Sequence, residues 1–186
     1  MNEVKEYIKG FFRNVKSDSD FTEQFFIKQL ESMNKCKVWA ALEALEDIGT
    51  IESIDALKKC ALRPIQDAQI SSLYVLRKII GNDIADFAAS LLENSKYREK
   101  RTAMIHCCEV CNEDYRQIIE KHLKKATSRY RACLDTDRYI CDTTVVLHYL
   151  LYLKRINQPI GKVRALLLSR RDKLTNNEII AVENAP

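Results

Sequence analysis

The chain has 186 residues, of which 46% are hydrophobic and 30% are charged, and its formal net charge at pH 7 is +4. This balance excludes an intrinsically disordered chain, which would combine few hydrophobic residues with a large net charge. Because no stretch rich in Pro, Gly or Ser divides the sequence, we expect one domain over residues 1–186.

The N-terminal region, residues 1–35, is expected to form a pair of helices. Apolar residues recur at spacings of three and four over residues 4–15, which places them on one helical face. A second helix is expected over residues 21–33, because Asp20 and Glu23 have the spacing of an N-cap residue and its reciprocal partner. Its predicted core face consists of Phe26, Ile27 and Leu30.

The next two helices are delimited by glycine and proline. We expect Gly49 to end the first of them in the left-handed conformation that glycine adopts without a steric penalty. Thr50 can then cap the following helix, which should end at Arg63 because Pro64 cannot continue the hydrogen-bond ladder. The residues expected to face the core are Val38, Ala41, Leu42, Leu45 and Ile48 in the first helix and Ile54, Leu57 and Ala61 in the second.

This pairing of a longer and a shorter helix recurs. The predicted pairs are 67–80 with 83–93, 98–111 with 114–126, and 138–155 with 160–173, where Asn157 and Pro159 mark the turn inside the last pair. Thr175 and Glu178 have the spacing of a capping box before a short final helix. No segment has the signature of a β-strand, so we expect an all-α protein.

The pairs share a repeat of about 31 residues. The equivalent positions are Leu42, Leu45 and Gly49, then Leu73, Leu76 and Gly81, then Met104, Cys107 and Asn112. A period of roughly 30 to 50 residues is typical of helical units that cannot bury their apolar faces alone and therefore stack on one another.

Residues 39–62, WAALEALEDIGTIESIDALKKCAL, resemble the HEAT-like repeat of armadillo-type α-solenoid proteins. They share its alanine- and leucine-rich first helix, its glycine turn and its second helix with an Ile-x-x-Leu core. The resemblance is weaker over residues 66–93 and faint over residues 98–126 and 138–173.

The resemblance implies a fold and a division of the chain. The fold would be a right-handed α-α superhelix of helical hairpins whose second helices line the concave side. Residues 1–35 would form an N-terminal helical pair, residues 36–126 three HEAT-like repeats, and residues 138–186 a divergent C-terminal repeat and cap. Proteins of this kind usually hold another macromolecule, although a few catalyse reactions.

Compartment and membrane association follow from local composition. The first twelve residues carry acidic side chains and no uninterrupted apolar run, so we expect no secretory signal and a cytoplasmic protein. The most apolar stretch, residues 139–153, contains Asp142 and His148 and is shorter than the roughly 20 apolar residues that span a bilayer. We therefore expect a buried helix there and no membrane partner.

The residues capable of chemistry form no recognisable site. Cys108 and Cys111 have the C-x-x-C spacing of a metal site and His106 lies near them, but no second ligand pair is present. We expect the seven cysteines to be reduced, with Cys107 and its neighbours in the core, and no metal, cofactor or small-molecule substrate. No nucleophile motif or phosphate-binding loop is present, and no His is followed by the Glu found in iron hydroxylases of the HEAT-like class.

Charge is distributed unevenly along the chain. Residues 1–93 contain 12 Lys and Arg and 15 Asp and Glu, a net charge of −3, whereas residues 94–186 contain 18 and 11, a net charge of +7. The basic half would attract an acidic protein surface or a phosphate backbone and speed association with it. A solvated face without a partner is the alternative interpretation.

Three functional hypotheses follow from this pattern. The first is a non-catalytic protein-binding solenoid, an adaptor or an inhibitor such as a bacterial immunity protein that neutralises a toxin, whose partner carries an acidic patch. The alternatives are a HEAT-type nucleic-acid binder that uses the basic half, and an enzyme of the HEAT-like lyase or hydroxylase kind. We favour the first, with no catalytic residues. Its expected binding residues are the solvent-facing positions of the second helices, namely Asp55, Lys58, Lys59, Asp86, Ser90, Arg116, Glu120, Lys121 and Lys124.

Overall fold

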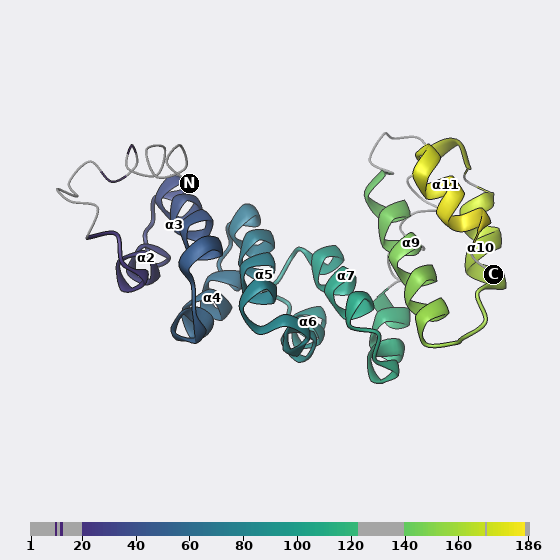
Figure 1. Cartoon of the computed structure of the whole chain (residues 1–186), viewed down its shortest axis with the longest axis horizontal. Coiled ribbons are helices and arrows are strands. Elements are labelled where there is room, and N and C mark those ends of the chain that lie inside the picture. The colour runs from purple at the N-terminus through teal and green to yellow at the C-terminus, as the bar shows by residue number, and fades with distance from the viewer. Residues whose placement is uncertain (1–9, 11, 13–19, 123–139, 170, 185–186) are drawn as a thin grey trace. The chain divides into compact units, whose positions relative to one another are not determined.

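The computed structural model describes residues 10, 12, 20–122, 140–169 and 171–184 (Figure 1). All regular secondary structure in these residues is helical, as expected from the sequence. The chain divides into two compact units, which we call unit 1 (Met1–Ile84 and Asn94–Glu99) and unit 2 (Ala85–Glu93 and Lys100–Pro186). None of the helices within the described ranges is long and apolar enough to cross a bilayer.

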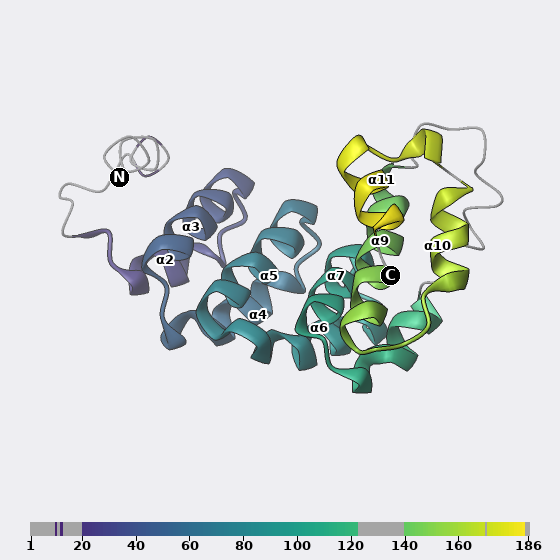
Figure 2. The same cartoon turned by 45° about the vertical axis from the view of Figure 1, so that its right-hand side comes forward.

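The elements of unit 1 whose bounds are described are α-helices and short 3-10 turns. They are α2 (Glu23–Gln29), α3 (Lys35–Ile48), η2 (Ile51–Ser53), α4 (Ile54–Ala61), α5 (Gln66–Ile80) and η3 (Gly81–Asp83). Helix α3 contacts both α2 and α5, and α4 packs against α5, so that α3 and α5 lie side by side (Figure 2). The core between them is aliphatic and consists mainly of Leu42, Leu45, Leu57, Leu73 and Leu76.

The start of α2 differs from the sequence prediction. Thr22, not Asp20, is the N-cap, and its hydroxyl accepts a hydrogen bond from the Phe25 N–H at 3.2 Å. Glu23 does not close a capping box, because its carboxylate instead accepts hydrogen bonds from Thr50 and Ser53 at the turn between α3 and α4. The carboxylate therefore links two helical elements rather than stabilising one helix end.

The end of α2 also lies earlier than expected. The helix stops at Gln29, with Leu30 as its C-cap. The guanidinium of Arg63, at the end of α4, donates hydrogen bonds to the carbonyls of Leu30 and Ser32, the latter at 2.7 Å. This arginine satisfies two backbone carbonyls just beyond α2, where the helical hydrogen-bond ladder has ended.

Two glycines end helices for different reasons. Gly49 is extended, with φ −65° and ψ 139°, so the prediction of a left-handed Gly49 is wrong. A Cβ there would lie 2.4 Å from the Leu45 carbonyl oxygen and 3.0 Å from the Ile79 Cδ1, which shows that close approach excludes a side chain. Gly81 has φ +60°, a value that favours glycine. Ile48, expected in the core, is the last residue of α3 and is 44% exposed.

Most of the other expectations for unit 1 are confirmed. Val38, Ala41, Leu57 and Ala61 are buried. The Thr50 hydroxyl accepts a hydrogen bond from the Glu52 N–H at 3.3 Å and caps η2, which precedes α4.

Residues 94–99 belong to unit 1 because a buried amide holds them there. The Gln69 side chain on α5 accepts a hydrogen bond from the Arg98 N–H at 3.0 Å and donates one to the Lys96 carbonyl at 3.3 Å. Tyr97 is fully buried beside it.

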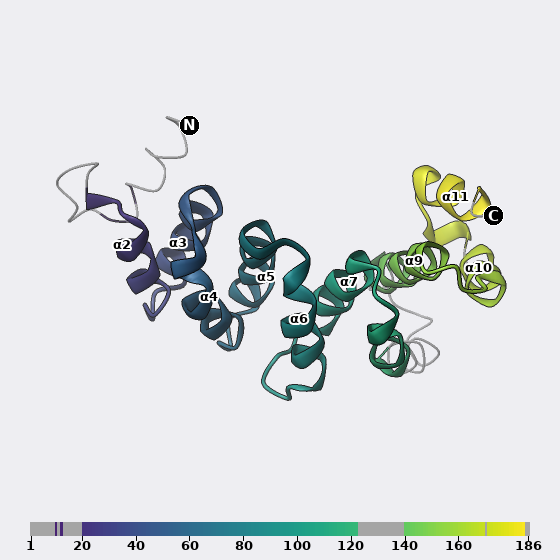
Figure 3. The ribbon, with the colours of Figure 1, turned by 60° about the horizontal axis from the view of Figure 1, so that its bottom comes forward.

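Unit 2 contains the remaining helices. They are α6 (Ile84–Glu93, which begins at the last residue of unit 1), α7 (Lys100–Val110), η4 (Glu113–Tyr115), a helical segment over residues 116–122, α9 (Ile140–Arg155), α10 (Gly161–Leu168), η5 (Arg171–Lys173) and α11 (Asn176–Glu183). Helix α9 packs against α7 and α10, and α10 lies beside α11 (Figure 3).

The turns of unit 2 agree in part with the sequence. Asn157 has φ +54° at the predicted turn after α9, and Thr175 and Glu178 form the predicted capping box of α11. In the third repeat, the left-handed residue is Cys111, with φ +60°, one position before Asn112, the residue aligned with Gly81. The helix predicted over residues 4–15 and the segment 123–139 lie outside the described residues, apart from Gly10 and Phe12.

Candidate functional site

The sequence-predicted residues of unit 1 lie together on α4. Asp55 and Lys59 are exposed and one turn apart, and Lys58, between them in sequence, is half-buried. These three side chains share one face of the second helix of a hairpin, as expected from their spacing.

The α6 candidates in unit 2 make contacts within the unit. The Asp86 carboxylate accepts a hydrogen bond from the Tyr115 hydroxyl at 2.6 Å, which, together with burial, raises the pKa of Tyr115 to about 12. The Ser90 hydroxyl donates to the carbonyl of Phe87 at 2.7 Å. Both side chains thus contribute to local structure while remaining exposed.

Arg116 and Glu120 form a connected network. The two side chains pair at 3.0 Å, the Tyr149 hydroxyl on α9 donates to Glu120 at 2.5 Å, and Arg116 donates to the Gln158 side chain at 2.7 Å. Burial, followed by the bond to Glu120, raises the pKa of Tyr149. The network joins the 116–122 segment to α9 and to the turn that follows it.

Lys121, the remaining candidate among the described residues, makes an ion pair within unit 2. Lys121 pairs with Glu93 at 2.8 Å, and His122 approaches the same carboxylate at 3.4 Å. Hydrogen bonding by Lys121 is the largest influence on Glu93 and lowers the pKa of that carboxyl. Lys124 lies outside the described residues.

The histidine and cysteine residues of α7 are core residues. His106, Cys107 and Cys108 are buried, and Cys111, just after the end of α7, is half-buried. Burial raises the pKa of Cys107 to about 12 and also raises that of Cys108, which keeps both thiols protonated and unreactive at neutral pH. Within the described ranges, no three His, Cys, Asp or Glu side chains are placed to hold a metal ion.

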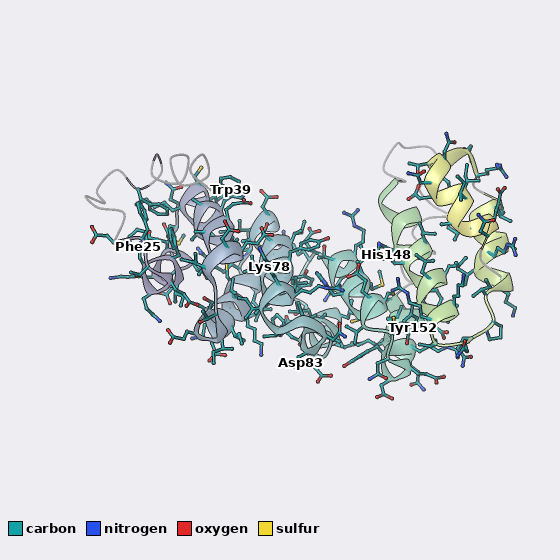
Figure 4. The ribbon with its side chains drawn as sticks, in the orientation of Figure 1. Phe25, Trp39, Lys78, Asp83, His148 and Tyr152 are labelled. Atoms are coloured by element: carbon teal, nitrogen blue, oxygen red, sulfur yellow. The ribbon has the colours of Figure 1, made fainter. Side chains whose placement is uncertain are left out.

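A cleft in unit 1 is the second candidate site. It has a volume of about 260 Å³ and lies between the N-terminal ends of α3 and α5. Its lining is mostly apolar, with Trp39, Leu42 and Ile65, and it carries one charge of each sign, Lys35 and Asp67. Figure 4 shows Trp39 near one end of α3.

The exposed sides of α3 and α5 continue from this cleft. Lys78 of α5 lies 3.8 Å from Glu46 and 3.7 Å from Asp47, near the C-terminal end of α3 (Figure 4). The two helices therefore run parallel, with the cleft at one end of their shared surface and this ion-pair cluster at the other. We call this surface the α3–α5 face, defined by Cys36, Trp39, Glu43, Glu46 and Asp47 on α3 and by Asp67, Ser71, Tyr74 and Lys78 on α5.

The α3–α5 face is unusual in its aromatic content and its charge. Tyr74 is 51% exposed, although it lies in the middle of α5, and Trp39 is half-buried. Glu43 is surrounded on its own helix by Glu46 and Asp47, and burial followed by these two like charges raises its pKa. The face thus combines an apolar cleft with a cluster of carboxylates that Lys78 balances only in part.

Sequence reasoning missed this face because the resemblance to HEAT-like repeats directed attention to second helices. The solvent positions of α3 recur at spacings of three and four, as do Asp67, Ser71, Tyr74 and Lys78 on α5. A tyrosine at the solvent-facing phase of a first helix was the available signal.

Comparison of the chain with protein-family models, curated protein sequences and solved structures finds no match.

Proposed function

We propose that the chain is a non-catalytic protein-binding protein that belongs to the helical-repeat class. The observation that carries this proposal is the α3–α5 face, where the half-buried Trp39 lines an apolar cleft and Tyr74 is exposed farther along α5. Tryptophan and tyrosine are enriched at protein interfaces, and binding hot spots concentrate where such side chains meet pockets.

The size and lining of the cleft favour a protein side chain over a small-molecule substrate. Its volume of about 260 Å³ is below the roughly 300–1,000 Å³ of typical ligand pockets. Its polar groups, Lys35 and Asp67, bear opposite charges and form no catalytic constellation. A large apolar side chain of a partner would fill such a space and displace water from it.

We further propose that the hairpins continue as a right-handed α-solenoid. The packing of α3 against α5 supports this arrangement, because first helices of successive hairpins are neighbours in a stack. The second-helix positions Asp55, Lys58 and Lys59 would then line another binding surface in unit 1. The excess of positive charge after residue 94 favours a partner with an acidic patch there.

The test is purification of the tagged full-length chain from its native cells, with and without nuclease, followed by reconstitution with any retained protein. We expect a protein that survives nuclease treatment and forms a complex of defined stoichiometry in sedimentation. We expect duplex DNA to bind only in the non-specific range, roughly 10⁻⁴ to 10⁻⁶ M at physiological salt.

Two results would overturn the proposal. One is nanomolar, structure-selective binding of a nucleic acid at physiological salt, and the other is the absence of any protein complex. If a complex forms, the partner's own activity in it separates an adaptor, which leaves that activity intact, from an inhibitor such as an immunity protein, which abolishes it.

A further inference from the structure

We infer that the α3–α5 face binds a segment of another protein that presents one large apolar side chain and, about 10 Å away, one Lys or Arg. This inference rests on the proposed protein-binding function and specifies the partner's chemistry at this face. Two features of the face carry it, the cleft at one end and the unevenly balanced carboxylates at the other.

The apolar requirement comes from the cleft. Trp39 and Leu42 on one side and Ile65 and Ala68 on the other leave a space of about 260 Å³ that is open to solvent. Transfer of an apolar side chain from water into such a space is favourable in proportion to the area buried. The exposed Cys36 lies at the edge of the cleft and is uncharged, so it does not disfavour an apolar occupant.

The cationic requirement comes from the carboxylates. Glu43, Glu46 and Asp47 are three acidic residues within five positions of α3, and the paired cation Lys78 lies beyond direct hydrogen-bonding distance, at 3.7 to 3.8 Å from the last two. Like charges at spacings of three and four on a helix repel one another. Glu43 experiences this repulsion while it is half-buried, and burial together with the two neighbouring carboxylates raises its pKa. A second cation beside Glu46, on the side of Glu43, would relieve a repulsion that the free protein retains.

The spacing follows from helix geometry. Trp39 and Glu46 are seven residues apart on α3, which corresponds to a rise of roughly 10 Å at 1.5 Å per residue. An extended partner covers this distance in about three residues and a helical partner in about seven. The apolar anchor and the basic residue should therefore be separated by one of these two intervals.

The experiment uses a phage-displayed library of random twelve-residue peptides, selected on the immobilised full-length chain. We expect enriched peptides to combine Trp, Phe, Leu or Met with Lys or Arg at one of the two intervals. Their affinities are then measured by fluorescence polarisation at low and at physiological salt. A consensus of acidic peptides, or one without a basic residue, would overturn the inference.

Matched variants assign the binding to this face. Asp47→Lys should weaken the enriched peptides at least fivefold at low salt, whereas Asp55→Lys, the same change on α4 of the same unit, should change their affinity less than twofold. Trp39→Ala should weaken binding at least tenfold. Cys36→Arg, at the exposed edge of the cleft, should also weaken binding at least tenfold, and it does not alter the core. This variant therefore tests the cleft even if Trp39→Ala destabilises the fold.

The outcomes separate this inference from the proposed function. Equal effects of Asp47→Lys and Asp55→Lys, or full peptide affinity in Cys36→Arg, would overturn the inference while a reconstituted protein complex still stands. A complete absence of protein complexes would overturn the proposed function itself.

Discussion

Replacement of Glu23 by alanine is expected to destabilise unit 1 by about 2 kcal/mol. The carboxylate accepts hydrogen bonds from the Thr50 N–H at 2.7 Å, from the Thr50 hydroxyl at 2.9 Å, and from the hydroxyl of Ser53, which is fully buried. Hydrogen bonds to a charged group contribute roughly 1.5–3 kcal/mol each, and a buried hydroxyl left unpaired costs about 1–3 kcal/mol. Water can replace the carboxylate at the exposed Thr50, so we expect the Ser53 contribution to dominate.

The assay is urea unfolding followed by the fluorescence of Trp39, the single tryptophan of the chain, which lies in unit 1. Glu31→Ala, at an exposed position just after the same helix, is the control and should change stability by less than about 0.5 kcal/mol. Glu23→Gln, which keeps one acceptor oxygen, should have an intermediate effect.

The same pair of variants tests a pH dependence. Burial raises the pKa of Glu23, but hydrogen bonds from Ser53 and Thr50 outweigh it, and the net pKa is below the ordinary value of 4.5. The stabilisation is therefore fully present above pH 4.5 and is lost as the pH falls through the lower folded-state pKa. Equal stability of Glu23→Ala and Glu31→Ala at pH 7, or a difference between them that persists unchanged at pH 3, would refute this reasoning.

Three further predictions concern separate parts of the structure. Gly49→Ala should lower the free energy of unfolding, measured by calorimetry, by more than about 1 kcal/mol, because the added Cβ would lie 2.4 Å from the Leu45 carbonyl oxygen. The control Gly161→Ala, whose Cβ would have nothing within 4 Å, should be neutral or slightly stabilising in the same measurement. Tyr149→Phe should destabilise unit 2 by about 1–2 kcal/mol through loss of its bond to Glu120, and thermal melts in which this variant is as stable as the unchanged chain would contradict that contact. Iodoacetamide under native conditions should label the exposed Cys36 within minutes and leave Cys107 and Cys108 unlabelled until unfolding; mass spectrometry that finds Cys107 and Cys36 labelled equally fast would contradict the burial described for α7.

The helical architecture was predictable because the core of unit 1 follows simple periodicity. Leu42, Leu45, Leu73 and Leu76 recur at helical spacing and at the 31-residue repeat, and all four are buried. The capping box of Thr175 and Glu178 was equally accessible, since both of its hydrogen bonds are local in sequence. The patterns that created these two features lie within the sequence itself, and both were predicted correctly.

Features determined by distant residues were not. Asp20 and Glu23 have the spacing of a capping box. The Glu23 carboxylate instead accepts hydrogen bonds from Thr50 and Ser53, which are 27 and 30 residues away. Gly49 is glycine because of a close approach to Leu45 and to Ile79 of the next hairpin, which local φ preferences do not reveal. Sequence periodicity shows which face of each helix is apolar, but it does not show which other element packs against that face.

The candidate binding surface shows the same division. The solvent phase of α4 predicted the shared face of Asp55, Lys58 and Lys59, whereas the pairing of Arg116 and Glu120 with α9 and its turn depends on tertiary contacts. The α3–α5 face depends on the parallel packing of two helices about 30 residues apart, which brings Lys78 to Glu46 and Asp47.

Site-specific photo-crosslinking in native cells tests the central claim most directly. A benzophenone side chain is placed at position 74, on the α3–α5 face, or at position 59, on the exposed side of α4, in the full-length chain. We predict a discrete covalent adduct with a single protein from position 74, lost when Cys36→Arg is added. A chain that forms adducts with nucleic acid from either position, or that forms none from both, would contradict the account.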